Sequence, residues 1–67
     1  MDAYYKTKNF EICIFHDKFR GYFEHNRLGE DCAGGLWFEC GKLTDYDGVF
    51  TLPAEVEMKL KELGYEI

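Results

Sequence analysis

Two short segments near the start of the chain alternate between two kinds of side chain, and this pattern constrains the fold most. In residues 10–16, an extended backbone places Phe10, Ile12 and Ile14 on one side and Glu11, Cys13 and Phe15 on the other. Residues 19–25 alternate again, with Phe19, Gly21, Phe23 and His25 on one face and Arg20, Tyr22 and Glu24 on the other. Because only two residues separate the segments, an antiparallel hairpin is the economical pairing.

The middle of the chain predicts a loop and then a second hairpin. Residues 26–35 contain three glycines together with Asn26, Glu30 and Asp31, which favours turns and a bend before the next strand. Residues 36–40 alternate and predict a third strand, and residues 43–46 return beside it. Asp47-Gly48 favours a tight turn, and Val49-Phe50 is a short apolar run leading out of it.

The last segment carries the start and stop signals of a helix. Thr51 is a candidate for the N-cap or for the N′ residue just before it, Pro53 suits the first turn, and Gly64 is placed to end the helix. An apolar stripe that can lie on a sheet is formed by Val56, Leu60 and Leu63. On the solvated side, i,i+4 ion pairs are expected between Glu55 and Lys59 and between Glu57 and Lys61.

These elements predict an α+β fold for residues 1–67 as a single small domain. The expected architecture is a three- to four-stranded antiparallel sheet with one C-terminal helix packed on one face. The uncovered face would carry aromatic side chains from among Phe15, Tyr22 and Trp37, together with Glu39, which is much apolar surface to leave in water. Either the sheet curls to bury this surface, or a partner or second copy covers it.

The chain is near the lower size limit for folding without a metal or a disulfide, but it is apolar enough to build a dense core, with 46% apolar and 18% aromatic residues. Its three cysteines are an odd number and are expected to be free thiols, with Cys13 in the core. No apolar run is long enough to span a membrane, and the N-terminus has no apolar signal core, so we expect a cytoplasmic protein.

The residue types and their spacing do not favour an enzyme or a metal-binding protein. Serine is absent, and Cys32 lies beside acids that disfavour a thiolate nucleophile. Cys13 and His16 would point to opposite faces of a strand, and no CxxC or HxxxH pair is present. We therefore expect no catalytic residues, no cofactor and no metal.

Charge is distributed unevenly along the chain. Residues 28–67 carry nine acids and three bases, a net charge of −6, whereas residues 1–27 carry four acids and five bases, a net charge of +1. An acidic surface repels nucleic acids and anionic membranes and is steered toward basic protein surfaces. The charge pattern thus favours a protein partner with a basic groove over direct nucleic-acid or membrane binding.

In size, acidity and aromatic density, with the segments EICIFHD, GYFEH and AGGLWFECGKLTDYDGVFTLPAEV, the chain resembles the small phage-encoded anti-CRISPR proteins. These proteins block type I CRISPR surveillance complexes. The resemblance implies a non-enzymatic inhibitor in the cytoplasm of the host bacterium. Several members of this class mimic DNA and occupy the groove in which the complex inspects the protospacer-adjacent motif.

Carboxylates spaced on a rigid sheet can present charge to Arg and Lys much as phosphates do, and aromatic anchors with charged rims are typical of binding hot spots. On this basis the predicted partner-binding residues are Glu30, Asp31, Trp37, Glu39, Asp45, Tyr46 and Asp47. The expected partner is a subunit of a type I CRISPR surveillance complex. The alternative is a small phage or bacterial structural or regulatory interaction module, monomeric or homodimeric through its bare sheet face, with an ordinary solvated acidic surface.

Overall fold

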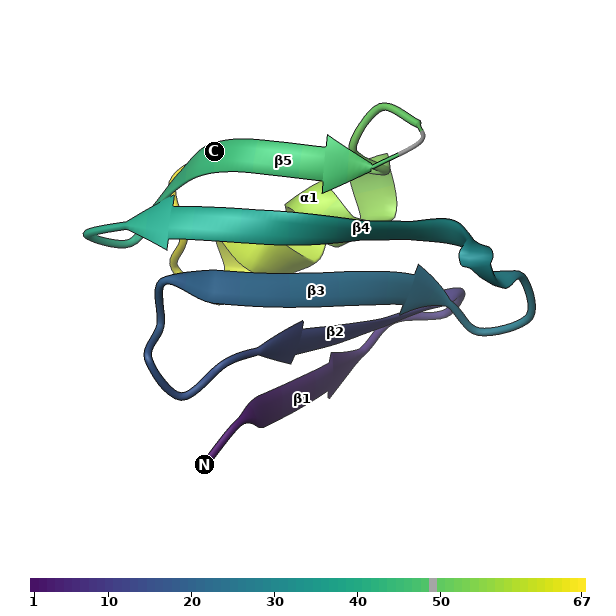
Figure 1. The fold of residues 1–67 in the computed structure, drawn as a ribbon, viewed down its shortest axis with the longest axis horizontal. Coiled ribbons are helices and arrows are strands. Elements are labelled where there is room, and N and C mark those ends of the chain that lie inside the picture. The colour runs from purple at the N-terminus through teal and green to yellow at the C-terminus, as the bar shows by residue number, and fades with distance from the viewer. Residues whose placement is uncertain (49) are drawn as a thin grey trace.

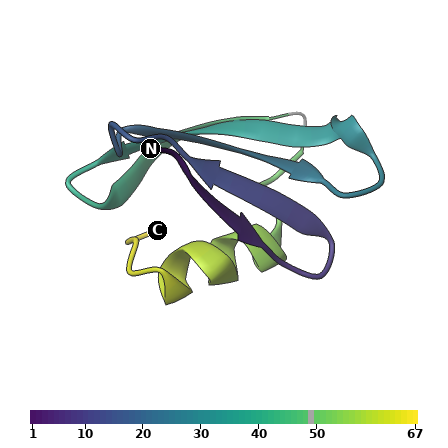
Figure 2. The same ribbon diagram turned by 90° about the horizontal axis from the view of Figure 1, so that it is seen from below.

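The computed structural model describes residues 1–48 and 50–67, and an antiparallel sheet is its main feature (Figure 1). In this part of the chain the sheet has five strands: β1 (Ala3–Lys6), β2 (Phe10–Ile14), β3 (Arg20–His25), β4 (Gly29–Glu39) and β5 (Lys42–Gly48). They lie side by side in sequence order, each antiparallel to the next. The helix α1 (Ala54–Glu62) covers one face of the sheet and leaves the other face open (Figure 2).

The predicted α+β class is confirmed, as is the hairpin of β2 and β3, but the expected three or four strands become five. The additional strand, β1, pairs with β2. Its sequence, AYYK, has no apolar alternation, so nothing in the local pattern marked it as a strand. The tight turn predicted at Asp47-Gly48 is wrong because both residues belong to β5. The predicted run Val49-Phe50 includes a residue outside the described part of the chain.

The predicted loop over residues 26–35 is also wrong in its second part, because β4 begins at Gly29. Two aromatic rings explain how glycines come to lie within a strand. A Cβ added at Gly34 would lie 2.6 Å from Cε1 of Tyr46, and one added at Gly35 would lie 3.0 Å from Cη2 of Trp37. Each ring therefore lies across a glycine, one on each face of the sheet, and covers backbone that the glycine leaves bare.

The core lies between the sheet and α1. Its side chains come from alternate positions of β2, β3 and β4, as the sequence pattern predicted for β2 and β3, and from one side of the helix. The buried members are Phe10, Ile12, Ile14, Phe23, Leu36, Phe38, Val56 and Leu60. Burial of this apolar surface is the main source of stability for so small a domain.

Polar contacts fix the start of α1 against the sheet. Pro53 is the N-cap residue and no side chain caps the helix, so Thr51, two residues earlier, is neither the N-cap nor the N′ residue, and both predicted roles are wrong. The Glu55 carboxylate instead accepts hydrogen bonds from the backbone N and the Nδ2 of Asn9, at 3.2 and 3.3 Å. Within the described residues neither predicted i,i+4 ion pair forms; Lys59 Nζ lies 3.5 Å from Glu62 Oε1.

The end of α1 follows the sequence signal. Gly64 has a φ of +100°, its N–H donates to the Lys61 carbonyl, and the Tyr65 N–H donates to the Leu60 carbonyl, which together form a Schellman motif. The Tyr65 ring then packs on Phe38, with ring centroids 4.6 Å apart. No helix within residues 1–48 and 50–67 is long and apolar enough to cross a bilayer.

Candidate protein-binding face

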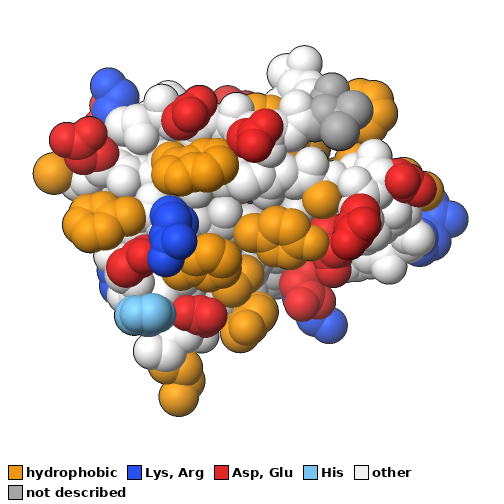
Figure 3. All heavy atoms as spheres, in the orientation of Figure 1, with side chains coloured by type: hydrophobic (Ala, Val, Ile, Leu, Met, Phe, Trp, Pro, Cys, Tyr) orange, Lys and Arg blue, Asp and Glu red, His pale blue; other side chains and the backbone are white. Residues whose placement is uncertain are grey.

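The face of the sheet opposite α1 carries three rows of side chains that run across the strands. The first row is Lys6, Glu11, Glu24 and Ala33; the second is Tyr4, Cys13, Tyr22, Gly35 and Asp47; the third is Phe15, Arg20, Trp37 and Asp45. We call this set the open face. It faces the viewer in Figure 3, where hydrophobic side chains gather over the middle of the sheet and acidic side chains lie among and around them.

The aromatic side chains of the open face remain accessible to solvent. Tyr4 is 66% exposed, Tyr22 37% and Trp37 38%. As the alternation predicted, Phe15, Tyr22 and Trp37 share this face, and curling of the sheet does not bury them. Glu39 follows a core-facing residue, Phe38, and so lies on the same side at the end of β4.

A hollow of about 310 Å³ lies in the part of the open face formed by β1, β2 and β3. Its lining consists of Asp2, Tyr4, Glu11, Cys13, Phe15, Tyr22 and Glu24. Cys13, predicted as a core residue, is only 8% exposed, but its side chain lies beneath this hollow rather than against α1. Burial, reinforced by the Asp2 carboxylate, raises the pKa of the Cys13 thiol, so the thiol stays protonated at neutral pH and is a weak nucleophile.

A hydrogen bond joins two side chains at the rim of this hollow. The Tyr22 hydroxyl donates to Glu24 Oε2 at 2.5 Å. This bond, with partial burial and the nearby negative charge, raises the pKa of Tyr22 to about 12. Tyr22 is therefore neutral at physiological pH and holds one oxygen of the Glu24 carboxylate at its hydroxyl group.

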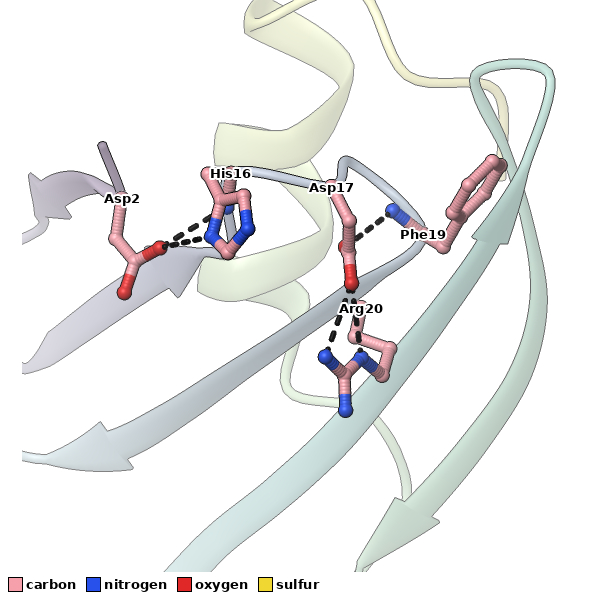
Figure 4. Close-up of polar contacts among 5 residues, drawn as sticks. All are labelled: Asp2, His16, Asp17, Phe19 and Arg20. Carbon is pink, nitrogen blue, oxygen red and sulfur yellow. Dashed lines mark hydrogen bonds and ion pairs between the residues drawn. The ribbon is translucent and has the colours of Figure 1, made fainter.

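The turn between β2 and β3 holds two further carboxylates in fixed positions (Figure 4). Asp2 Oδ1 accepts a hydrogen bond from the backbone N of His16 at 2.9 Å. Asp17 accepts from the backbone N of Phe19 at 2.9 Å and from Nε and Nη2 of Arg20 at 3.1 and 2.9 Å. The Phe19 N–H, followed by the Arg20 guanidinium, lowers the pKa of Asp17. Both acids are thus engaged within the molecule.

The structure brings three of the predicted partner-binding residues together on the open face. Trp37 lies directly opposite Asp45 in the β4–β5 register, and Gly35, which the Trp37 ring covers, lies opposite Asp47. Glu39 lies on the same side, near the turn between the two strands. Trp37, Asp45 and Asp47 therefore form one continuous patch of the sheet.

Tyr46, by contrast, points to the helix face. It lies opposite the fully buried Leu36, and its ring stacks on Phe23 with centroids 5.9 Å apart and an interplanar angle of 15°. Its hydroxyl donates to the Phe50 carbonyl at 2.6 Å, and burial raises its pKa. The two aromatic residues proposed as anchors, Trp37 and Tyr46, thus lie on opposite faces of the sheet.

Glu30 and Asp31 lie at the far end of β4. The β3–β4 register shifts here, because His25 pairs with Gly29 while Glu24 pairs with Ala33, so these acids bulge from the ladder. At about 3.3 Å per residue, Asp31 is about 26 Å along the strand from Glu39. The predicted acids therefore do not converge on one site.

The predicted acids are not neutralised within the described part of the chain. The ion pairs there are Lys6–Glu11, His16–Asp2, Arg20–Asp17 and Lys59–Glu62, and none includes a predicted partner-binding residue. Asp45 accepts one hydrogen bond, from the backbone N of Tyr46 at 2.8 Å. Its charge, like that of Asp47, is presented to solvent.

Several residues of the open face were not among the predicted partner-binding residues: Tyr4, Glu11, Cys13, Phe15, Tyr22 and Glu24. The alternation in β2 and β3 already grouped Glu11, Cys13 and Phe15 on one side of β2 and Tyr22 and Glu24 on one side of β3, although Cys13 was expected in the core. Tyr4 joins them only through β1, which no local sequence pattern predicted.

In residues 1–48 and 50–67, no three or more His, Cys, Asp or Glu side chains are grouped so as to hold a metal ion. Cys13, Cys32 and Cys40 are free thiols.

Comparison with models of known protein families, with curated proteins and with solved structures finds no match to this chain.

Proposed function

We propose that this chain is a non-enzymatic inhibitor whose open face binds a basic, nucleic-acid-binding surface of another protein. The observation that carries the proposal is a single face on which exposed Trp37 and Tyr22 lie beside carboxylates, Asp45 and Asp47, that form no ion pair in the described part of the chain. An aromatic centre with a charged rim is the usual composition of a binding hot spot.

The spacing of the carboxylates suits recognition of Arg and Lys. Asp45 and Asp47 are two residues apart on one strand, so they project from the same face about 7 Å apart. Each can accept a charge-assisted hydrogen bond from an arginine, and the strand keeps the two at fixed separation. These carboxylates would present negative charge to a DNA-binding groove much as the phosphates of DNA do.

The resemblance to anti-CRISPR proteins supplies the target that we propose, a type I CRISPR surveillance complex in the bacterial cytoplasm. Inhibition would result from occupation of the DNA-binding groove, in equimolar amount and without chemistry. The acidity of the chain as a whole, with a formal net charge of −5, would also speed its encounter with a basic groove.

Charge favours such a partner over a second copy of the chain. A two-fold dimer through the open face would place the same patch of each copy against the other. Carboxylates of the two copies, including those of Asp45, Asp47 and Glu24, would then approach one another, and like charges at an interface are costly. A basic partner offers the opposite charge to each of them.

Size-exclusion chromatography of the purified protein with a purified type I surveillance complex, at low and at high salt, tests this function. We expect co-elution that weakens with salt and that blocks binding of target DNA. The variant Asp45→Lys/Asp47→Lys should lose co-elution, whereas the charge-matched control Glu57→Lys/Glu62→Lys on α1 should keep it.

Elution of the protein alone at both salt concentrations would refute this target. Equal binding by the two double variants would refute the role of the open face. A dimer-sized peak of the protein by itself would favour the homodimeric module instead.

A further inference from the structure

Two glutamates occupy neighbouring positions on the open face. Glu11 and Glu24 are directly opposite in the β2–β3 register and project from the same face. Like charges at such positions destabilise a sheet. The nearest base is Lys6, opposite Glu11 on β1, with Nζ 3.7 Å from Glu11 Oε2 and a side chain 77% exposed. Glu24 belongs to no ion pair of the described residues, and its Oε2 accepts the Tyr22 hydroxyl proton.

Aromatic rings adjoin this acid pair. The hollow of about 310 Å³ is lined by both carboxylates and by the rings of Tyr4, Phe15 and Tyr22. The pairing Tyr4–Cys13–Tyr22 places the small, buried thiol between two tyrosines, and all three residues line the hollow. Its walls are therefore apolar and its rim is negative, which suits an organic cation with a flat, weakly hydrated head.

The same face already contains one arginine in such surroundings. The Arg20 guanidinium lies 5.4 Å from the centroid of the Phe15 ring, while Asp17 accepts its Nε and Nη2 protons. Within this molecule, the face of an aromatic ring and a carboxylate therefore already bind one guanidinium group together.

We propose that the hollow receives one arginine side chain of the basic partner, with the guanidinium between Tyr4 and Tyr22 and its N–H groups directed to Glu11 and Glu24. This inference rests on the proposed function and names the partner group that the open face recognises. Arginine fits better than lysine because its planar fork can reach two separate carboxylates while stacking on a ring.

The test is a ¹H–¹⁵N NMR titration of the full chain with the peptide acetyl-Gly-Gly-Arg-Gly-Gly-amide. The control peptide carries citrulline, which has nearly the shape of arginine but no charge. We expect arginine to shift the resonances of Tyr4, Cys13 and Tyr22 and to bind about five- to tenfold more tightly than citrulline. The variants Glu11→Gln and Glu24→Gln should each lose most of this preference, whereas Glu57→Gln on α1 should retain it.

Equal shifts with both peptides, or arginine-dependent shifts confined to Asp45 and Asp47, would overturn the inference. Dispersed spectra of the two glutamine variants establish that they are folded, and each tests the site independently of the other. The outcomes also separate the two proposals. If the hollow does not prefer arginine but the wild-type protein still co-elutes with the surveillance complex, only this inference is refuted. If the wild-type protein does not co-elute with the complex, the proposed function is refuted.

Discussion

The two faces of the sheet differ most clearly at neighbouring residues of β4. Leu36 is fully buried against α1, whereas Trp37, the next residue, is 38% exposed on the open face. A chain of 67 residues with a nine-residue helix covers one face of its sheet and leaves the other to water. Stability is therefore concentrated on the helix face, and the aromatic residues of the open face are available for binding.

The glycine pair of β4 repeats this contrast. Gly34 lies beneath Tyr46 on the helix face, and Gly35 lies beneath Trp37 on the open face. Both rings cover a glycine, but only Tyr46 is also packed against the core, through Phe23. The contact between an aromatic ring and a glycine is therefore part of the packed core on the helix face. On the open face the same kind of contact leaves the aromatic ring accessible to solvent.

The largest expected difference is between Leu36→Ala and Trp37→Ala. Removing the buried leucine leaves a cavity and should lower the free energy of unfolding by about 2–5 kcal/mol. Removing the exposed tryptophan should cost less than about 1 kcal/mol, in the range of ordinary surface changes plus the lost cover of Gly35. Urea denaturation followed by circular dichroism measures both. If the two variants lose similar amounts of unfolding free energy, the claim that stability is concentrated on the helix face is wrong.

A smaller difference is expected between Gly34→Ala and Gly35→Ala. The new methyl group at residue 34 meets the Tyr46 ring, which the core restrains, so we expect a loss of about 1–3 kcal/mol from overpacking. At residue 35 the Trp37 ring can move into solvent, and the loss should be smaller, below about 1 kcal/mol. The same urea experiment compares them; a larger loss for Gly35→Ala would show that the Trp37 ring is structurally required.

The alkylation rates of Cys13 and Cys40 test whether the rings around the hollow shield the Cys13 thiol. Cys40 is exposed in the β4–β5 turn, whereas Cys13 is buried and has a raised pKa, so Cys40 should react first with an alkylating reagent. Tyr4→Ala removes one wall of the hollow and should accelerate alkylation of Cys13, on the order of tenfold, with little change at Cys40. Peptide mass spectrometry at timed intervals gives both rates, and an unchanged Cys13 rate would mean that Tyr4 does not shield it.

The smallest effect on stability is expected for Glu24→Gln. Without the carboxylate, the pKa of Tyr22 should fall from about 12 toward its ordinary value of 10. Because the folded-state pKa lies above the unfolded one, the stabilisation that Tyr22 gains is complete below pH 10 and is lost as the pH rises through about 12. NMR of ¹³C-labelled tyrosine follows the titration; an unchanged pKa would assign the shift to burial instead.

Sequence patterns predicted the elements whose signals are local. Alternation defined β2, β3 and their faces, and Gly64 marked the end of α1. The signals were insufficient where contacts between strands decide. AYYK becomes a strand only by pairing with β2, and the ring that covers Gly34 in β4 is that of Tyr46 on β5. The same applies to the candidate site. The charge count drew attention to the second half of the chain, yet β1, β2 and β3 contribute the hollow, and the register separates Glu30 and Asp31 from Asp45 and Asp47.

Oxidative footprinting of side chains, in the free protein and in the presence of a purified type I surveillance complex, tests most directly whether the open face is the binding surface. Met58 on α1 is 70% exposed and serves as the internal reference for the other side of the molecule. We predict that the complex protects Trp37 and Tyr22 from oxidation and leaves Met58 as reactive as before. Protection of Met58 with Trp37 unchanged, or an unchanged footprint throughout, would contradict the account.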